Sequence, residues 1–161
     1  MKYRTLGFTL FVALVSAPAA AQDCASDKPL LVSGAVPRAL GKSPIWMTSE
    51  SFPIKWTDAG TPAQLIWLID AKAREPFYVS GKHLASGAPV KFTKIGDRVG
   101  MRQTRWRLDP LGYKPTHAKP QDFTKFIFDR NFAWFPAAGC YEMRGQARDQ
   151  VSIIRVQVGD K

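Results

Sequence analysis

Short runs of strand-forming residues, separated by turn residues, recur along almost the whole chain after residue 21. Twelve prolines and twelve glycines punctuate the sequence, and helix signals are scarce. The runs are rich in branched and aromatic residues, as is typical of strands. The predicted strands are residues 30–33, 45–48, 52–57, 64–70, 77–80, 89–95, 101–108, 140–145 and 151–158. Short strands at this spacing predict an all-β antiparallel sandwich, with a small β-barrel as the alternative.

Five segments predict how that sandwich is arranged. Residues 64–70 are continuously apolar, as expected of a strand buried on both sides. Residues 89–95 are mixed on both faces, which favours an edge strand. Residues 140–145 and 151–158 predict a terminal hairpin whose buried face carries Ile154, Val156 and Val158. The aromatic-rich residues 123–135 fit a strand or a short helical turn, and more often form core than an exposed platform for a carbohydrate or a partner.

The N-terminus has the organisation of a secretory signal peptide. Lys2 and Arg4 precede an apolar run at residues 6–15, and small residues end at Ala19 and Ala21, where a signal peptidase requires them. The apolar run is too short to span a bilayer, which needs roughly 20 residues. Nothing after Ala21 resembles a second membrane segment. We therefore expect residues 1–21 to be removed and residues 22–161 to form one domain in the periplasm or the medium.

The two cysteines lie near the two ends of the mature chain. Cys24 and Cys140 are the only cysteines, and an exported protein enters a compartment that oxidises thiols. A bond between them would fix the N-terminal tail to a late strand and stabilise the fold by about 4 to 5 kcal/mol in the chain-entropy model. The alternative is two free thiols, with Cys140 buried. The pattern favours the disulfide.

The chain is basic, with a formal net charge of +10 that falls to +8 when Lys2 and Arg4 are removed. Export argues against nucleic acid as the partner. It favours polyanions of the cell envelope, such as lipid head groups and acidic polysaccharides, or a protein partner. The candidate anion-binding residues surround one predicted hairpin: Lys91, Lys94, Arg98, Arg102, Arg105 and Arg107. A plain solvated sheet face is the alternative interpretation of the same charges.

Three motifs occur in a characteristic order. They are Gly41-Lys42-Ser43-Pro44-Ile45-Trp46, Leu65-Ile66-Trp67-Leu68-Ile69-Asp70 and Gly139-Cys140-Tyr141-Glu142. In this order they resemble motifs of a group of uncharacterised exported bacterial proteins that consist of a single immunoglobulin-like domain. The resemblance implies an immunoglobulin-like sandwich with no defined activity, with Trp67 and Tyr141 in its structural core. Alternation along residues 101–108 adds Trp106 to the expected core. Ala138 stands where those proteins usually have a proline, so the turn into the last strands is expected to differ.

The sequence offers little that is typical of an enzyme. The Gly-x-Ser-x-Gly pentad of serine hydrolases is absent, and the two histidines, His83 and His117, both fall in predicted loops. Histidines and cysteines are not clustered at metal-ligand spacing, and no phosphate-binding glycine loop occurs. We therefore expect no catalytic residue, metal or cofactor.

Three functions remain as expectations. The first is a non-catalytic binding or interaction module of the envelope, engaging anionic glycans or lipid head groups through a basic face. The second is a structural or assembly accessory that docks by strand pairing along the edge that contains Lys91. The third, and least favoured, is a hydrolase of an unfamiliar kind.

Overall fold

The computed structural model describes residues 24, 30–32, 36–49, 54–56, 62–73, 75–96, 101–108 and 125–159, and of residues 30–32 and 36–38 it describes the backbone alone. Regular structure in these residues consists of strands, and none of them belongs to a helix long and apolar enough to cross a membrane. The strands are β1 (Leu30–Val32), β2 (Val36–Lys42), β3 (Ile45–Ser49), β4 (Ala63–Asp70), β5 (Tyr78–His83), β6 (Lys91–Thr93), β7 (Arg105–Arg107), β8 (Phe126–Trp134), β9 (Gly139–Ala147) and β10 (Gln150–Val158).

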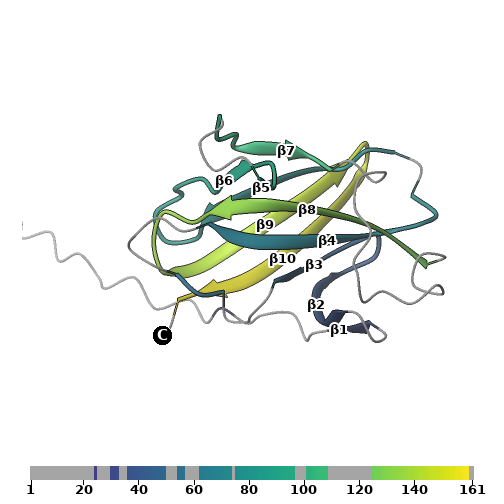
Figure 1. The fold of residues 1–161 in the computed structure, drawn as a ribbon, viewed down its shortest axis with the longest axis horizontal. Helices are drawn as coiled ribbons and strands as arrows, with labels where there is room; N and C mark the ends of the chain where they lie inside the picture. The colour runs from purple at the N-terminus through teal and green to yellow at the C-terminus, as the bar shows by residue number, and fades with distance from the viewer. Residues whose placement is uncertain are drawn as a thin grey trace, which may run out of the picture.

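The described strands form two antiparallel sheets. The larger sheet has the order β1-β2-β3-β4-β8-β6, and the smaller sheet has the order β10-β9-β5-β7. In Figure 1 the strands β4 and β8 of the larger sheet cross β9 and β10 of the smaller sheet at an angle. Short backbone links join the sheets at one side, where Phe92 and Gln103 exchange two hydrogen bonds of 2.7 and 3.0 Å. The predicted antiparallel sandwich is confirmed, and the strands do not close into the alternative barrel.

The strand order is that of an immunoglobulin-like sandwich. Such domains pair strands A, B, E and D in one sheet and C, F and G in the other. Strands β3, β4 and β8 take the places of A, B and E, and β5, β9 and β10 take those of C, F and G. Strand β6 lies beside β8, in the place of D, while β7 extends the smaller sheet beyond β5. On the other side of the sandwich, Ile54 forms an isolated parallel bridge with Val158 of β10.

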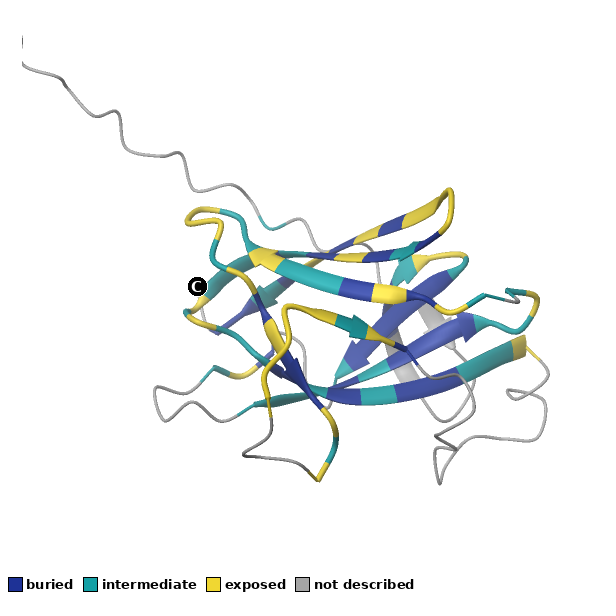
Figure 2. Ribbon diagram, turned by 90° about the horizontal axis from the view of Figure 1, so that it is seen from above, coloured by how far each residue is buried: buried dark blue, intermediate teal, exposed yellow. Residues whose placement is uncertain are grey.

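The core lies between the two sheets and follows from the alternation of side chains along the strands. Leu65, Trp67 and Ile69 of β4 face Tyr141 and Met143 of β9 across one apolar cluster. Figure 2 shows buried residues concentrated along the strands and exposed residues at hairpin ends and loops. The indole N–H of Trp67 donates to Asn131 Oδ1 at 3.2 Å, which satisfies the polar atom of the largest buried side chain. Trp106 is half-buried against the same cluster.

The strongest sequence patterns correspond to observed strands. The continuous apolar run is β4, an interior strand with buried residues on both of its faces. The predicted terminal hairpin is β9 and β10, and Ile154, Val156 and Val158 are buried in it as expected. The aromatic-rich segment forms the long strand β8. The prediction missed β2, because Pro37 and Gly41 are turn signals, whereas the backbone of β2 continues through both residues.

Cys24 and Cys140 form the predicted disulfide. Their Cα atoms are 5.4 Å apart, and the bond joins residues separated by 116 positions. Cys140 is the second residue of β9, so the bond ties the N-terminal tail to the strand in the place of F. Antibody domains instead connect two strands of the sandwich with their disulfide. A disulfide of this kind fits a protein that works in an oxidising compartment.

The hydroxyl of Tyr141 links the start of β9 to the preceding turn. It donates to Ala137 O at 2.7 Å and accepts from Ala137 N at 3.1 Å. This link to the backbone four residues upstream is the tyrosine corner of immunoglobulin-like domains. Burial raises the pKa of Tyr141 above its ordinary value of 10.0, and the hydrogen bond to Ala137 partly opposes that rise. The corner therefore depends on a neutral phenol.

Candidate functional site

The outer face of the smaller sheet carries exposed side chains on all four of its strands. Along β9 and β10, inward residues are buried, and the residues between them point to solvent or are half-buried. Register then sets the outward residues of four strands side by side. Ile153 of β10 lies opposite Arg144 of β9, Arg144 opposite Ser80 of β5, and Ser80 opposite Arg105 of β7. One row across the sheet therefore carries two arginines and one aliphatic residue.

The neighbouring rows continue this pattern. Val151, Gln146, Tyr78 and Arg107 form the row on one side, and Arg155, Glu142 and Lys82 form the row on the other. Among the described residues of this surface, five side chains are cationic and one is a carboxylate. We call this surface the basic face, and its charged members are Lys82, Arg105, Arg107, Glu142, Arg144 and Arg155.

Two contacts fix parts of the basic face. The guanidinium of Arg105 lies over the ring of Tyr78, 4.4 Å from the ring centroid. Lys82 Nζ lies 3.7 Å from Glu142 Oε1, with the Lys82 side chain 57% exposed and the Glu142 side chain 20% exposed. Because the lysine end of the pair is in water, the pair contributes no more than about 1 kcal/mol to stability. The remaining cations are exposed and point to solvent.

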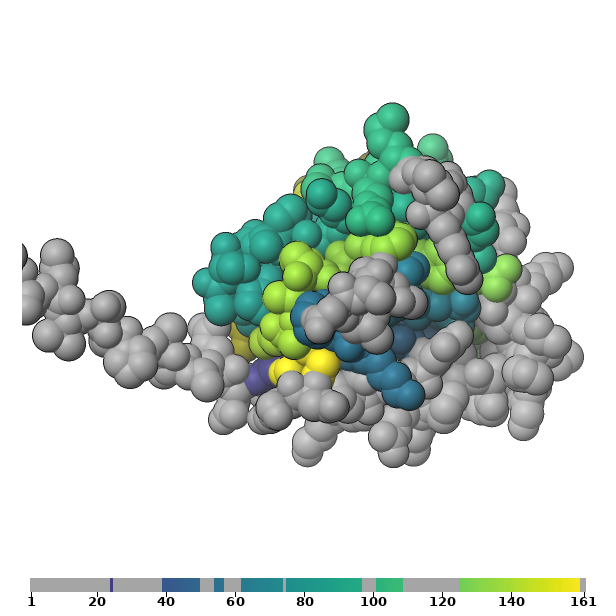
Figure 3. All heavy atoms as spheres, turned by 60° about the vertical axis from the view of Figure 1, so that its left-hand side comes forward, coloured from purple at the N-terminus to yellow at the C-terminus, as the bar shows by residue number. Residues whose placement is uncertain are grey.

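The structure separates the predicted anion-binding residues into two groups. Arg105 and Arg107 lie on the basic face. Lys91 and Lys94 are exposed on and just after β6, at the edge of the larger sheet, and therefore do not belong to that face. In Figure 3 the teal residues of the β5 to β7 region gather on one side of the molecule, beside the lighter green of β8.

Arg102 also lies outside the basic face. The Arg102 guanidinium stacks on Trp134 of β8, 3.6 Å from the ring centroid, and this cation–π contact ties Arg102 to the larger sheet. Arg98 lies outside the described residues. The predicted set is thus divided between two sheets, because the chain crosses from one sheet to the other between β6 and β7.

The prediction missed three cations of the basic face: Lys82, Arg144 and Arg155. Arg144 and Arg155 lie at outward positions of the predicted terminal hairpin, so alternation alone could have shown that they are exposed. Their approach to Arg105 depends on the pairing of β9 with β5, and of β5 with β7. Pairing between strands so far apart in sequence leaves no local signal.

The basic face also carries most of the exposed large apolar side chains of the described residues. Tyr78 is 36% exposed, Val151 38% and Ile153 42%. The other such residue is Met101, which is 84% exposed and lies before β7, outside these rows. Single exposed apolar residues are ordinary on a protein surface, whereas a group of them among cations is typical of a contact surface.

The edge of the larger sheet at β6 is already paired in the described structure. Phe92 uses its N–H and its C=O for the two hydrogen bonds with Gln103. On its other side β6 pairs with β8, with Lys91 opposite Trp134 and Thr93 opposite Phe132. A partner strand docking along the edge that contains Lys91 would have to displace the Gln103 segment.

His83 takes part in a local turn. Its Nδ1 lies 2.9 Å from Ser86 Oγ and accepts the backbone N–H of Ser86 at 3.2 Å, so in this arrangement Nδ1 carries no proton. Its Nε2 packs over Gly139, where any Cβ would collide with the ring, and Gly139 has a φ of +140°. Within the described part of the chain no carboxylate contacts the His83 ring. The histidine and serine therefore stabilise a turn, and His117 lies outside the described residues.

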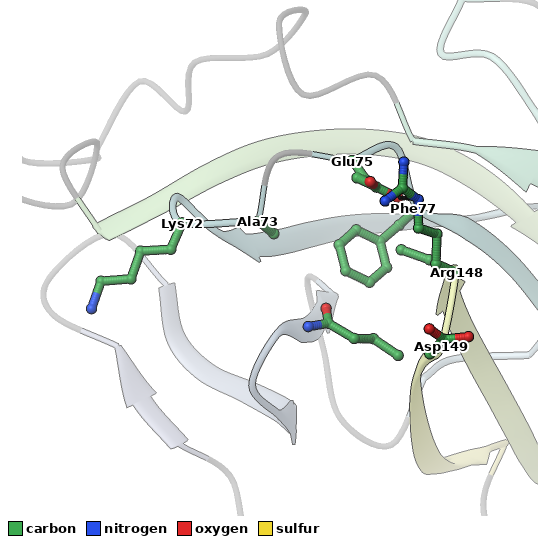
Figure 4. A pocket seen from close by; sticks show the side chains of 8 residues that line it. Lys72, Ala73, Glu75, Phe77, Arg148 and Asp149 are labelled. Atoms are coloured by element: carbon green, nitrogen blue, oxygen red, sulfur yellow. Dashed lines mark ion pairs between the residues drawn. The ribbon is translucent and has the colours of Figure 1, made fainter.

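A pocket of about 370 Å³ lies at one end of the sandwich, between the residues before β5 and the β9–β10 turn. Figure 4 shows the ring of Phe77 at its base, with Glu75 and Arg148 side by side at its rim. Arg148 Nε contacts Glu75 Oε2 at 2.7 Å, and Arg148 has a positive φ of 42°. The charged residues that line the pocket are two cations, Lys72 and Arg148, and two carboxylates, Glu75 and Asp149. The pocket thus lacks the single charge sign that distinguishes the basic face.

Among the described residues, no group of three or more histidine, cysteine, aspartate or glutamate side chains is placed to hold a metal ion. Compared with protein-family models, with curated proteins and with solved structures, the chain finds no match in any of the three. Interpretation of its function therefore depends on the geometry and chemistry of its own residues. The basic face is the described surface on which exposed cations and exposed apolar side chains lie together.

Proposed function

We propose that the chain is an exported, non-catalytic binding module of the bacterial envelope, and that its basic face holds an anionic partner. The observation that carries this proposal is the convergence of Lys82, Arg105, Arg107, Arg144 and Arg155 on one exposed sheet face, opposed by Glu142 alone among the described residues. Guanidinium groups match carboxylate and phosphate groups with two parallel hydrogen bonds. A field of one sign also speeds the encounter with an oppositely charged partner.

Three further features support export to the envelope. Residues 1–21 have the pattern of a signal peptide, and the disulfide fits an oxidising compartment. The motifs that contain Trp46, Trp67 and Cys140 resemble those of exported bacterial proteins. Outside the inner membrane, the abundant anions are lipid head groups, acidic polysaccharides and acidic proteins. The proposed location is therefore the periplasm or the medium.

The alternative of an assembly protein docking at the edge with Lys91 gains less support. Phe92 already exchanges two hydrogen bonds with Gln103 on that side of β6. The hydrolase alternative gains no support from His83, because its ring bonds to Ser86 of its own turn and packs against Gly139 and Tyr141 of β9. Neither alternative has an observation that favours it over binding at the basic face.

The test compares two pairs of cations that carry the same charge. The variant R105Q/R107Q removes two positive charges from the basic face, and K91Q/K94Q removes two from the edge of the larger sheet. All four side chains are exposed, so both variants are expected to fold, which circular dichroism checks. The measurement is the salt concentration that elutes each protein from immobilised dextran sulfate, since salt screens exposed charges beyond about 10 Å at 0.1 M.

We expect R105Q/R107Q to elute at clearly lower salt than the wild type, and K91Q/K94Q to elute close to it. Equal shifts in the two variants would mean that retention follows net charge alone. In that case the basic face would have no special role, and the proposal would be wrong.

A further inference from the structure

We infer that the anionic partner of the basic face is an acidic segment of another protein that also carries apolar side chains, rather than a glycan or a lipid bilayer. This inference rests on the proposed function and names the chemistry of its partner. The basic face combines Arg and Tyr with partly exposed Val and Ile. Aromatic residues, Met and Arg are enriched at protein–protein interfaces, whereas Lys is depleted there. Among the described cations of this face, four are arginines and one is a lysine.

Cations lie on all four strands of the basic face, whereas its two exposed aliphatic residues lie on one strand. Val151 and Ile153 lie on β10, at one side of the sheet, and Arg105 and Arg107 lie on β7, at the other. Arg144 lies between them, on β9. Neighbouring strands are about 4.8 Å apart, so the apolar residues and the most distant arginines are separated by roughly three such steps. Arg155 also lies on β10, two residues from Ile153. A partner that spans this distance therefore needs carboxylates along its length and apolar side chains where it crosses β10.

A glycan fits this surface poorly. Sugars stack on open aromatic faces, and Tyr78 is the aromatic residue of the described basic face. The Arg105 guanidinium lies 4.4 Å from the centroid of that ring and occupies the place where a sugar would stack. An acidic glycan would also have no use for Val151 and Ile153. Charge alone would attract it, and the apolar residues would add nothing.

A bilayer also fits poorly, because of the relative lengths of the side chains. Peripheral proteins that use apolar residues bury them roughly 5 to 10 Å deep, at the boundary of the head groups and acyl chains. Val151 and Ile153 stand on a sheet face beside Arg144 and Arg155, whose side chains are longer and exposed. The cations would meet the head groups first and hold the shorter apolar groups away from the acyl chains.

A second copy of the chain is disfavoured by charge. A symmetric dimer through this face would place the same surface on both sides of the interface. Five cations and one carboxylate would then face five cations and one carboxylate, and like charges in close contact cost several kcal/mol. The charge of the basic face therefore calls for a complementary, acidic protein surface.

The experiment uses three labelled probes against the full mature protein. Two are short synthetic peptides of equal length and charge, one alternating glutamate with leucine and one alternating glutamate with serine. The third is a vesicle of phosphatidylcholine with phosphatidylglycerol. Binding is measured by fluorescence anisotropy for the peptides and by co-sedimentation for the vesicles, at a salt concentration of about 150 mM, where the Debye length is about 8 Å.

We expect the wild type to bind the Glu-Leu peptide at least about fivefold more tightly than the Glu-Ser peptide, because Val151 and Ile153 bury further apolar area against leucine. The variant V151S/I153S should lose this preference while retaining its affinity for Glu-Ser. The variant M101S is the control, since it removes an exposed apolar residue that lies outside the rows of the basic face. It should keep the preference.

The outcomes separate the two proposals. If R105Q/R107Q binds all three probes as the wild type does, the proposed function fails. If R105Q/R107Q weakens binding but the wild type binds both peptides equally, only the inference about an apolar, acidic protein segment fails. If V151S/I153S weakens vesicle binding more than Glu-Leu binding, the partner is a membrane surface, and the inference is again overturned.

Discussion

The outer faces of the two sheets differ in what happens to their apolar side chains. On the larger sheet, Trp46, Leu68 and Phe128 point away from the central core and are nevertheless buried in a second apolar cluster. On the smaller sheet, Val151 and Ile153 also point away from the core but remain partly exposed among cations. The outer face of the larger sheet thus contributes buried apolar area to stability, whereas the outer face of the smaller sheet is left available for contacts.

The sequence patterns of the strands account for this difference. Strand β4 is apolar on both faces, so burying only one of them would leave Leu68 in water. Strand β10 alternates, with inward Ile154 and Val156 and with outward Arg155. Alternation of this kind is expected of a strand with one solvent face. The comparison therefore predicts that substitutions on the larger sheet change stability and that those on the smaller sheet change binding.

The largest expected effect comes from truncating one outward aliphatic residue on each sheet. Leu68 is 0% exposed, and Leu68→Ala should lower the free energy of unfolding by about 2 to 5 kcal/mol through lost burial and a cavity. Ile153→Ala, on the outer face of the smaller sheet, should cost less than about 1 kcal/mol, since that side chain is already partly in water. Urea unfolding measures both values.

If Leu68→Ala and Ile153→Ala lowered the free energy of unfolding by similar amounts, the proposed difference between the two outer faces would be wrong. Equal losses would mean that the surroundings of Ile153 are as closed as those of Leu68. Retention on dextran sulfate supplies the complementary measurement. The folded fraction of Leu68→Ala should be retained like the wild type, because no cation of the basic face has been removed.

Much of the fold could be predicted because its strands have strong local patterns. The apolar run of β4 and the alternation of β9 and β10 identify these strands without knowledge of their partners. Strand β2 could not be recognised, because Pro37 and Gly41 are turn signals when taken alone. In the structure both residues belong to a strand at the periphery of the larger sheet, where tertiary context overrides local preference.

The candidate site was only partly predictable. Arg105 and Arg107 follow from alternation within one predicted strand. Arg144 and Arg155 join them only through the register of β9 with β5 and of β5 with β7. Lys91 and Arg102 are close to Arg105 in sequence, but they lie with the larger sheet. Sequence proximity therefore grouped residues that the topology separates.

The second prediction concerns Tyr141, which faces inward on the strand whose outward residues include Arg144. Tyr141→Phe removes both hydrogen bonds to Ala137 and should cost about 1 to 3 kcal/mol, because the Ala137 N–H and C=O lose their partner. Binding of the Glu-Leu peptide should be unchanged. A loss of binding without a loss of stability would mean that inner and outer faces are not independent.

The same residue predicts a pH dependence. The pKa of Tyr141 is raised in the folded state, mainly by burial, so the unfolded chain releases this proton first as the pH rises. The stabilising contribution is complete below pH 10.0, the ordinary tyrosine value, and is lost as the pH rises through the folded-state pKa. Above pH 10.0 the wild type should therefore lose stability more steeply than Tyr141→Phe, as measured by urea unfolding at several pH values. Parallel curves for the two proteins would contradict the burial of a neutral phenol.

At Ser152, the inward neighbour of Ile153, we expect a substitution to raise the free energy of unfolding, by less than the losses expected at Leu68 and Tyr141. Ser152 is buried, and its hydroxyl has no hydrogen-bond partner in the described part of the structure. Ser152→Ala should therefore stabilise the protein by about 1 kcal/mol, since an unpaired buried hydroxyl is unfavourable. A higher urea midpoint with unchanged peptide binding would mean that the inward side of β10 affects stability and not binding. A lower midpoint would show that the hydroxyl has a partner.

The smallest expected effect is on the basic face itself. Glu142 is the carboxylate among the described charges of this face, and Glu142→Gln keeps its shape while removing its charge. The free energy of unfolding should change by less than about 1 kcal/mol, because the Lys82 ammonium that pairs with Glu142 is largely in water. Affinity for the Glu-Ser peptide should rise by about twofold to threefold, as expected for one charge removed at about 7 Å in a watery surrounding.

Glu75→Gln supplies the matched control for this prediction. It makes the same change of charge at the rim of the pocket, where Glu75 pairs with Arg148 rather than with a cation of the basic face. If the two variants raised affinity equally, attraction would follow the total charge of the protein. If only Glu142→Gln raises it, anions bind where Glu142 lies. The outer face of the smaller sheet is then the contact surface, because Glu142 lies in one row with Arg155 and Lys82 and does not line the pocket.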